Sequence, residues 1–213
     1  MFHHTRQTLT HSLALNLRRL RYGRPRAKVF CVGFQKTGTT SLQYALSLMG
    51  YRVAGIMNAN RHDTPEALHT EALRLLPQFD AFADNPWPLY FREFDAMFPE
   101  AKFILTTRDP DKWYESVCKH FGDSGSKMRA WVYGAATPRG NQQAYVDTLV
   151  THQKAVRAHF ADRPDDLMEF DVSAGHGWPE LCSFLDRPMP RRKFPKLNTA
   201  VISLMEAQVQ NAQ

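Results

Sequence analysis

A segment rich in glycine and hydroxyl groups is the part of the sequence best suited to chemistry. Residues 33–41 read GFQKTGTTS and begin where the apolar run KVFCVG at 28–33 ends. Glycines let the backbone curl so that its N–H groups point inward, and the positive end of a following helix adds to their potential. Hydroxyl groups supply more donors, and Lys36 supplies a full positive charge. The segment therefore predicts a loop that binds a phosphate or a sulfate group.

The position of the lysine separates this loop from the one found in nucleotide hydrolases. That loop has the pattern G-x-x-x-x-G-K-[ST], and Gly33 and Gly38 keep its glycine spacing. Thr39 follows the second glycine, however, and Lys36 lies inside the loop. This departure argues against an ordinary ATPase or GTPase. The alternative interpretation of residues 33–41 is a glycine-rich turn between a strand and a helix that binds no ligand.

A second candidate motif lies at the end of the strongest predicted strand. Residues 103–117 read FILTTRDPDKWYESV, with Arg108 at the end of the strand and Ser116 on the helix that follows. The planar guanidinium of an arginine binds two oxygens of a phosphate at once. Taken alone, Arg108 is equally suited to a surface ion pair with Asp109 or Asp111. Together with the glycine-rich loop, it indicates a second phosphate contact.

Both motifs resemble those of sulfotransferases that use 3′-phosphoadenosine 5′-phosphosulfate (PAPS). Residues 36–41 (KTGTTS) resemble the 5′-phosphosulfate loop, whose lysine contacts the phosphate that bridges to the leaving sulfuryl group. Arg108 and Ser116 resemble the 3′-phosphate site of that family, where a serine follows the strand-terminal arginine by eight positions. The two motifs cover about residues 28–120. The segment GWPELCSFL at 177–185 is similar to the end of the compact bacterial-type members.

The resemblance implies a donor, a product and a set of binding residues. The donor is PAPS, the product is 3′-phosphoadenosine 5′-phosphate (PAP), and no metal is expected. A basic segment near the C-terminus approaches the 3′-phosphate in many relatives, although three adjacent cations are also typical of a solvated loop. The residues implied in donor binding are Gln35, Lys36, Thr37, Gly38, Thr39, Thr40, Ser41, Arg108, Ser116, Arg192 and Lys193.

The base that takes a proton from the acceptor is expected to be Asp84. In cytosolic sulfotransferases a histidine occupies this place, after the strand that precedes the arginine-bearing one, so Asp84 is a departure. Other branches of the family use a carboxylate. An aspartate with an ordinary pKa of about 3.9 is a weak base unless burial raises that pKa. The alternatives for Asp84 are an N-cap for the helix near Pro88 or an ion-pair partner for Lys36. Lesser candidates for the base or the acceptor pocket are His62, His69, Glu93 and His176.

The acceptor and two rival functions stay open at this point. Trp87, Tyr90 and Phe91 follow Asp84 and would line an acceptor site or belong to the core. The acceptor itself is a small molecule, a carbohydrate or a lipid. The first rival function is a kinase that uses ATP and magnesium, with Asp84 beside the metal. The second is a module that binds the nucleotide without catalysis.

The elements that must position these residues alternate between strands and helices. Such alternation predicts an α/β fold with a central parallel sheet and helices on both faces, and the resemblance implies the P-loop-like sulfotransferase fold. Ligands of such sheets bind beyond the carboxyl ends of the strands. Strands are expected at 28–33, 51–55, 80–84, 102–107 and 167–171, and helices at 40–49, 64–76, 88–98, 110–121, 139–161 and 178–185. We expect one domain over 1–213, with an N-terminal helix in 1–27, a lid at 122–140 and a C-terminal helix at 198–213.

Composition sets broader limits. The chain has 43% hydrophobic and 23% charged residues, which is typical of a globular protein. No apolar run has the roughly 18 residues of a membrane span, so we expect a cytoplasmic protein without an integral membrane segment. The formal net charge of +6 suits an anionic ligand, but no arginine-rich run with aromatics indicates nucleic acid. The three cysteines have no metal-ligand spacing. The oligomeric state is not predicted.

Overall fold

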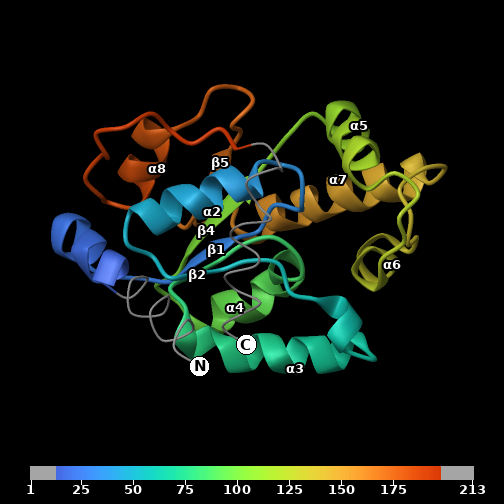
Figure 1. Ribbon diagram of the computed structural model, residues 1–213, viewed down its shortest axis with the longest axis horizontal. Helices are drawn as coiled ribbons and strands as arrows, with labels where there is room; N and C mark the ends of the chain where they lie inside the picture. Colours follow the sequence, from blue (N-terminus) through green and yellow to red (C-terminus); the bar gives the residue numbers. More distant parts are fainter. Residues whose placement is uncertain (1–12, 198–213) are drawn as a thin grey trace, which may run out of the picture.

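The computed structural model describes residues 13–197, and its centre is a five-stranded, all-parallel sheet (Figure 1). The strand order is β2-β3-β1-β4-β5, so β1 lies in the middle between β3 and β4. The strands are β1 (Val29–Cys31), β2 (Val53–Ala54), β3 (Ala81–Phe82), β4 (Lys102–Thr106) and β5 (Leu167–Phe170). The predicted parallel α/β architecture is confirmed.

Helices cover both faces of the sheet because alternate strand residues point to opposite sides. Phe30 and Phe103 pack against α3, α4 and α7, whereas Cys31 and Ile104 pack against α2 and α8. Residues 13–22 form a helix before β1. The other helices are α2 (Thr39–Leu48), α3 (Pro65–Leu75), α4 (Phe91–Met97), α5 (Pro110–Phe121), α6 (Lys127–Tyr133), α7 (Gln142–His159) and α8 (Trp178–Phe184), with the 3-10 turns η1 (Ala59–Arg61), η2 (Leu76–Gln78) and η3 (Trp87–Tyr90).

The predicted elements differ from the structure in two places, and a third prediction is not tested. β2 and β3 are shorter than the expected 51–55 and 80–84, and Asp84 has a left-handed backbone with φ of 73°, which an extended strand does not allow. The segment 122–140, for which a lid and no helix was expected, contains α6. The C-terminal helix expected at 198–213 lies outside the described residues.

The segment 122–140 packs against the body of the protein. Arg129 is buried and donates to the carbonyl oxygens of Ser124 and Ala136, so one side chain ties the two ends of the segment together. Tyr133, at the end of α6, stacks on Tyr145 of α7 with 4.2 Å between ring centroids. A lid function for this segment stays a prediction.

The loop after β1 reaches the end of β4 through a contact that only glycine allows. A Cβ atom on Gly33 would lie 2.0 Å from Thr106 Oγ1 and 2.4 Å from the carbonyl oxygen of Thr106. The Thr37 hydroxyl, in the same loop, lies 2.6 Å from the Thr106 hydroxyl and donates to the carbonyl of Phe34 at 2.6 Å. The loop is therefore held against the carboxyl end of the neighbouring strand.

The substitution Gly33→Ala tests this contact. We expect it to lower the free energy of unfolding by about 1–3 kcal/mol, because the added methyl group must displace backbone atoms of β4. Urea denaturation measures the change. Gly125→Ala is the matched control, since the nearest atom to its added Cβ lies at 3.9 Å. Equal stability of the two variants would contradict the tight contact.

Candidate functional site

The loop between β1 and α2 presents backbone donors at the start of a helix. Lys36 and Gly38 have positive φ angles of 68° and 106°, which turn the loop tightly before α2 begins at Thr39. No side chain among the described residues caps the N-terminus of α2. The positive end of the helix dipole and its first N–H groups therefore face the loop, which is the arrangement that binds phosphate or sulfate.

Aromatic side chains support the loop from the side of α5 and α7. The indole of Trp113, which is fully buried, donates to the carbonyl oxygen of Gln35 at 2.8 Å. The Phe34 ring stacks on His152 with 4.2 Å between centroids, and His152 donates to the carbonyl of Val32 at 2.7 Å. These contacts fix the backbone of the loop on the side facing the protein interior. Sequence reasoning missed them.

Asp84 connects the end of β3 to the start of α2. One carboxylate oxygen accepts from the Thr39 hydroxyl at 3.1 Å, and the other accepts from the backbone N–H of Asn85 at 2.8 Å. Burial raises the pKa of Asp84, and these hydrogen bonds and the positive charge of Lys36 partly oppose the rise. The carboxylate is therefore a stronger base than an exposed aspartate.

The side chain of Lys36 is influenced by one negative and one positive charge. Burial lowers the pKa of Lys36, the negative charge of Asp84 opposes this, and the positive charge of Arg108 adds to it. Arg108, which follows β4, donates to the carbonyl oxygen of Lys36 at 3.4 Å. Three groups that are far apart in the sequence thus meet at the carboxyl edge of β3, β1 and β4.

Arg108 faces the loop and forms no salt bridge with Asp109 or Asp111 among the described residues. Its Nε atom is buried and has no hydrogen-bond partner in that part of the chain. Asp109 caps α5 instead and accepts from the N–H of Lys112 at 3.0 Å. Ser116 is half-buried on α5. The guanidinium of Arg108 suits a further anion beside the loop, and a part for Ser116 in binding it stays a prediction.

The remaining predicted site residues divide into two groups. Thr37 and Ser41 make internal contacts: Thr37 binds Phe34 and Thr106, and the Ser41 hydroxyl accepts from the N–H of Leu197 at 3.0 Å. Arg192 lies elsewhere, beside Leu48 at the opposite end of α2 from the loop, and the exposed Lys193 follows it. The structure does not show Arg192 at the loop, so its role in donor binding, like that of Lys193, stays a prediction.

Three of the lesser candidates make contacts with segments other than the loop. His69 pairs with Glu93 at 2.7 Å between α3 and α4, and His176 accepts from the N–H of Asp171 at 3.2 Å. Trp87 and Phe91 are buried in the core. Sequence reasoning also missed His120 on α5, whose pKa is lowered by burial and then by the charges of Lys36 and Arg129. No spacing signal in the sequence connects His120 with Lys36.

Asn85 and Tyr133 form a buried polar region behind Asp84. Asn85 is completely buried, and Gln35 donates to the Tyr133 hydroxyl at 3.4 Å. Burial raises the pKa of Tyr133 well above its usual range, against the effect of the nearby Asn85 amide. Tyr133 therefore stays neutral at physiological pH. No group of three or more metal-ligating side chains occurs within residues 13–197.

Comparisons with known proteins agree with this geometry. A family model described as "Sulfotransferase domain" matches residues 28–144 and 124–201. The chain is also similar to the curated protein "Ava biosynthesis cluster protein M" from Aspergillus versicolor, with 27% identity over 220 aligned positions that cover 81% of each chain.

A titration of the Asp84 carboxyl carbon by NMR tests the electrostatics of the site. We expect a pKa above the ordinary value of about 3.9. Thr39→Ala should raise that pKa further, because the lost hydrogen bond favours the charged form. Thr40→Ala serves as the matched control, since its side chain makes no hydrogen bond to Asp84. A pKa of Asp84 at or below the ordinary value would contradict the account.

Proposed function

The chain belongs to the sulfotransferase domain family, and we propose that it moves a sulfuryl group from PAPS to a hydroxyl group of an acceptor. The choice of donor rests on the closeness of Arg108 to the loop. The Nη1 atom of Arg108 lies 3.4 Å from the Lys36 carbonyl oxygen. Its Nε atom is buried and has no hydrogen-bond partner among the described residues. A donor with phosphates at both its 5′ and 3′ positions requires two adjacent anion sites of this kind.

We assign the two ends of the donor to different parts of the carboxyl edge of the sheet. The N–H groups at the start of α2, together with Lys36, would hold the 5′-phosphosulfate. Arg108 and Ser116 would hold the 3′-phosphate, and this selects PAPS over ATP. When bound, the donor supplies an activated sulfuryl group.

The protein's own side chains then perform two tasks. Asp84, with its raised pKa, accepts the proton of the acceptor hydroxyl, so that the hydroxyl oxygen attacks the sulfur in line with the breaking S–O bond. Lys36 and the loop N–H groups stabilise the negative charge that develops on the leaving phosphate. No side chain needs to form a covalent bond.

The acceptor belongs to the broad class of hydroxyl-bearing small molecules, with carbohydrates and lipids included. The name of the similar Aspergillus protein places that protein in a biosynthesis cluster, which supports a small-molecule acceptor. No helix within residues 13–197 is long and apolar enough to cross a membrane. A cytoplasmic location, the single-domain boundary and the absence of a metal requirement stay predictions from the sequence.

Nucleotide binding tests the assignment of the two anion sites. We expect wild-type protein to bind adenosine 3′,5′-bisphosphate at least about tenfold more tightly than adenosine 5′-monophosphate, as a charge-assisted phosphate contact is worth about 1.5–3 kcal/mol. Arg108→Gln should remove most of that difference and leave the monophosphate affinity unchanged.

Arg139→Gln is the control for a general loss of positive charge, since Arg139 is exposed and pairs with Asp123. Isothermal titration calorimetry measures both affinities. Equal binding of the two nucleotides by the wild type would remove the basis for PAPS as the donor. Magnesium-dependent turnover of ATP would favour the kinase instead.

Transfer assays test the roles of Lys36 and Asp84. With PAPS and a panel of phenols, alcohols and sugars read by mass shift, Asp84→Asn should lower kcat by about 10²–10⁴ while the affinity for the bisphosphate is retained. Lys36→Met should lower kcat by a similar factor, because charge on the leaving group is less stabilised.

The pH dependence of kcat/KM adds a second readout. Asp84 must be ionised to act, so the rate should fall as the pH drops through its raised pKa, and Thr39→Ala should shift this fall to higher pH. His120→Asn is the matched control for a histidine base. If His120→Asn abolished the fall of kcat/KM at low pH and Asp84→Asn did not, His120 would be the base.

A further inference from the structure

The helix formed by residues 13–22 presents three leucines to solvent and directs Arg18 and Arg19 to the protein. Arg19 pairs with Asp80 at 2.5 Å and donates to the carbonyl oxygen of Gly50 at 3.1 Å. Arg18 donates to the carbonyl oxygen of Ser47 at 3.1 Å. These contacts fix the rotation of the helix about its axis. As a result, the exposed face carries Leu13, Leu17 and Leu20, with exposed fractions of 62%, 58% and 83%.

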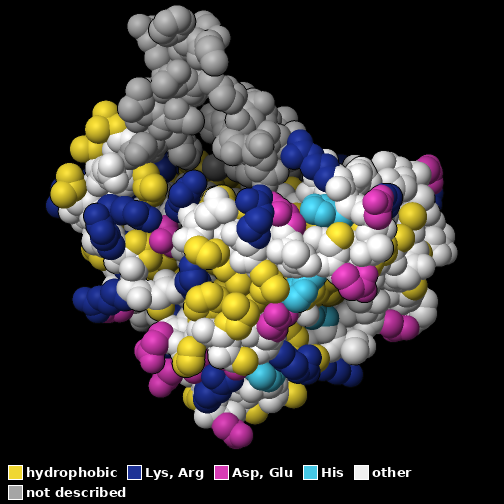
Figure 2. Space-filling view, turned by 90° about the horizontal axis from the view of Figure 1, so that it is seen from below, with side chains coloured by type: hydrophobic (Ala, Val, Ile, Leu, Met, Phe, Trp, Pro, Cys, Tyr) yellow, Lys and Arg dark blue, Asp and Glu magenta, His cyan; other side chains and the backbone are white. Residues whose placement is uncertain are grey.

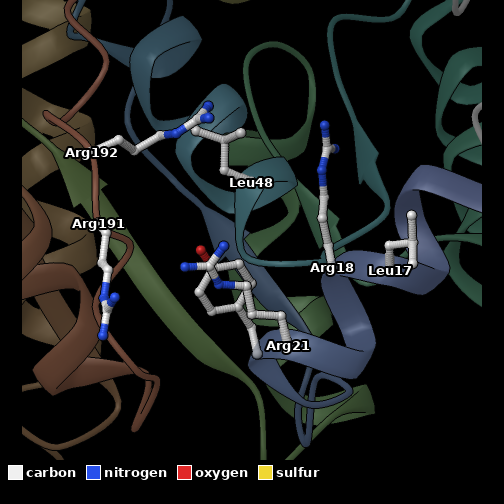
Figure 3. A pocket seen from close by; sticks show the side chains of 7 residues that line it. Leu17, Arg18, Arg21, Leu48, Arg191 and Arg192 are labelled. Atoms are coloured by element: carbon white, nitrogen blue, oxygen red, sulfur yellow. The ribbon is translucent and has the colours of Figure 1, made fainter.

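A basic cavity of about 320 Å³ lies beside this leucine face. Its lining comprises Leu17, Arg18, Arg21, Tyr22, Leu48, Arg191 and Arg192. Figure 3 shows Arg191 and Arg192 on one side and the helix residues on the other. Four of the seven lining residues are arginines and none is acidic. In Figure 2, hydrophobic and basic side chains lie close together at the left edge, the side where Figure 1 places this helix.

We propose that the leucine face of residues 13–22 and the adjoining arginine cavity form a docking surface for an anionic phospholipid bilayer. The leucines would enter the boundary between headgroups and acyl chains, as in interfacial amphipathic helices. Arg21, Arg191 and Arg192 would contact phosphate headgroups. The cavity adjoins Leu48, whereas the donor loop precedes Thr39 at the other end of α2, so a docked protein keeps its loop accessible to water.

Charge argues against a second copy of the chain as the occupant. In a two-fold dimer the same patch would face itself, and the arginines of both copies would be brought together. Like charges at an interface are unfavourable. The same arginines are complementary to a bilayer of negative charge, and that bilayer can also accept the leucines.

Vesicle flotation with the full chain tests the proposal. The vesicles contain phosphatidylcholine mixed with phosphatidylglycerol, or phosphatidylcholine alone. We expect binding to the mixed vesicles, weakened by salt, and at least about tenfold weaker binding to the neutral ones. Replacing Leu13, Leu17 and Leu20 together by glutamine should lower binding about tenfold or more. Arg21→Gln with Arg191→Gln should lower it about fivefold for each arginine removed.

Matched controls lie on other elements. Leu89→Gln with Met97→Gln removes two hydrophobic side chains that are 40% and 48% exposed, and Arg139→Gln with Lys154→Gln removes two exposed positive charges. Both control variants should bind vesicles as the wild type does. Circular dichroism verifies that each variant is folded.

Several outcomes would overturn the proposal. They are equal binding to neutral and anionic vesicles, an equal loss in the control variants, or no vesicle binding at all. Dimers in sedimentation velocity that the leucine variant converts to monomers, without vesicle binding, would identify a second copy as the occupant. Release from the vesicles by saturating adenosine 3′,5′-bisphosphate would assign the arginines to the donor site instead.

Discussion

The Thr106 hydroxyl, at the end of β4, lies against Gly33 and 2.6 Å from the Thr37 hydroxyl. This contact brings the loop after β1 to the end of the neighbouring strand. Because β1 is the central strand, the same loop also adjoins the end of β3, where the Thr39 hydroxyl reaches Asp84. The ends of β1, β3 and β4 are therefore close together. This closeness sets the relative positions of Lys36, Asp84 and Arg108.

The electrostatic properties of the three groups follow from that arrangement. Burial alone would favour a neutral lysine and a neutral aspartic acid. Lys36 and Asp84 oppose this for each other, whereas Arg108 adds a second positive charge beside Lys36. An anionic ligand with two charged ends would complement the excess of positive charge at this edge. The edge is therefore polarised, with the carboxylate of Asp84 on the β3 side and the positive charges of Lys36 and Arg108 on the β1 and β4 sides.

Local patterns in the sequence were enough to predict the parallel sheet and the glycine-rich loop, since these depend on neighbouring residues. They also placed Arg108 at a strand end, where adjacent parallel strands bring it to the loop. Contacts between distant segments could not be predicted in this way. The indole of Trp113 on the Gln35 carbonyl depends on how α5 is rotated, and the packing of Tyr133 depends on α6, whose sequence reads as a glycine-flanked loop.

Two further features show the same limitation. The basic segment after α8 is expected near the 3′-phosphate, and the structure shows only that Arg192 lies beside Leu48, so its role in donor binding stays a prediction. The sequence predicted an N-terminal helix and not the orientation of that helix. Arg18 and Arg19 contact the protein surface, so the leucines face outward. Periodicity identifies a hydrophobic face, and only tertiary contacts show what that face meets.

The most direct test of the donor assignment is a crystal structure of the protein with adenosine 3′,5′-bisphosphate. The account predicts the 5′-phosphate on the backbone N–H groups at the start of α2, within hydrogen-bond distance of Lys36. It predicts the 3′-phosphate on Arg108 and Ser116. A 3′-phosphate that points into solvent, or a nucleotide bound in the arginine cavity beside Leu48, would contradict it.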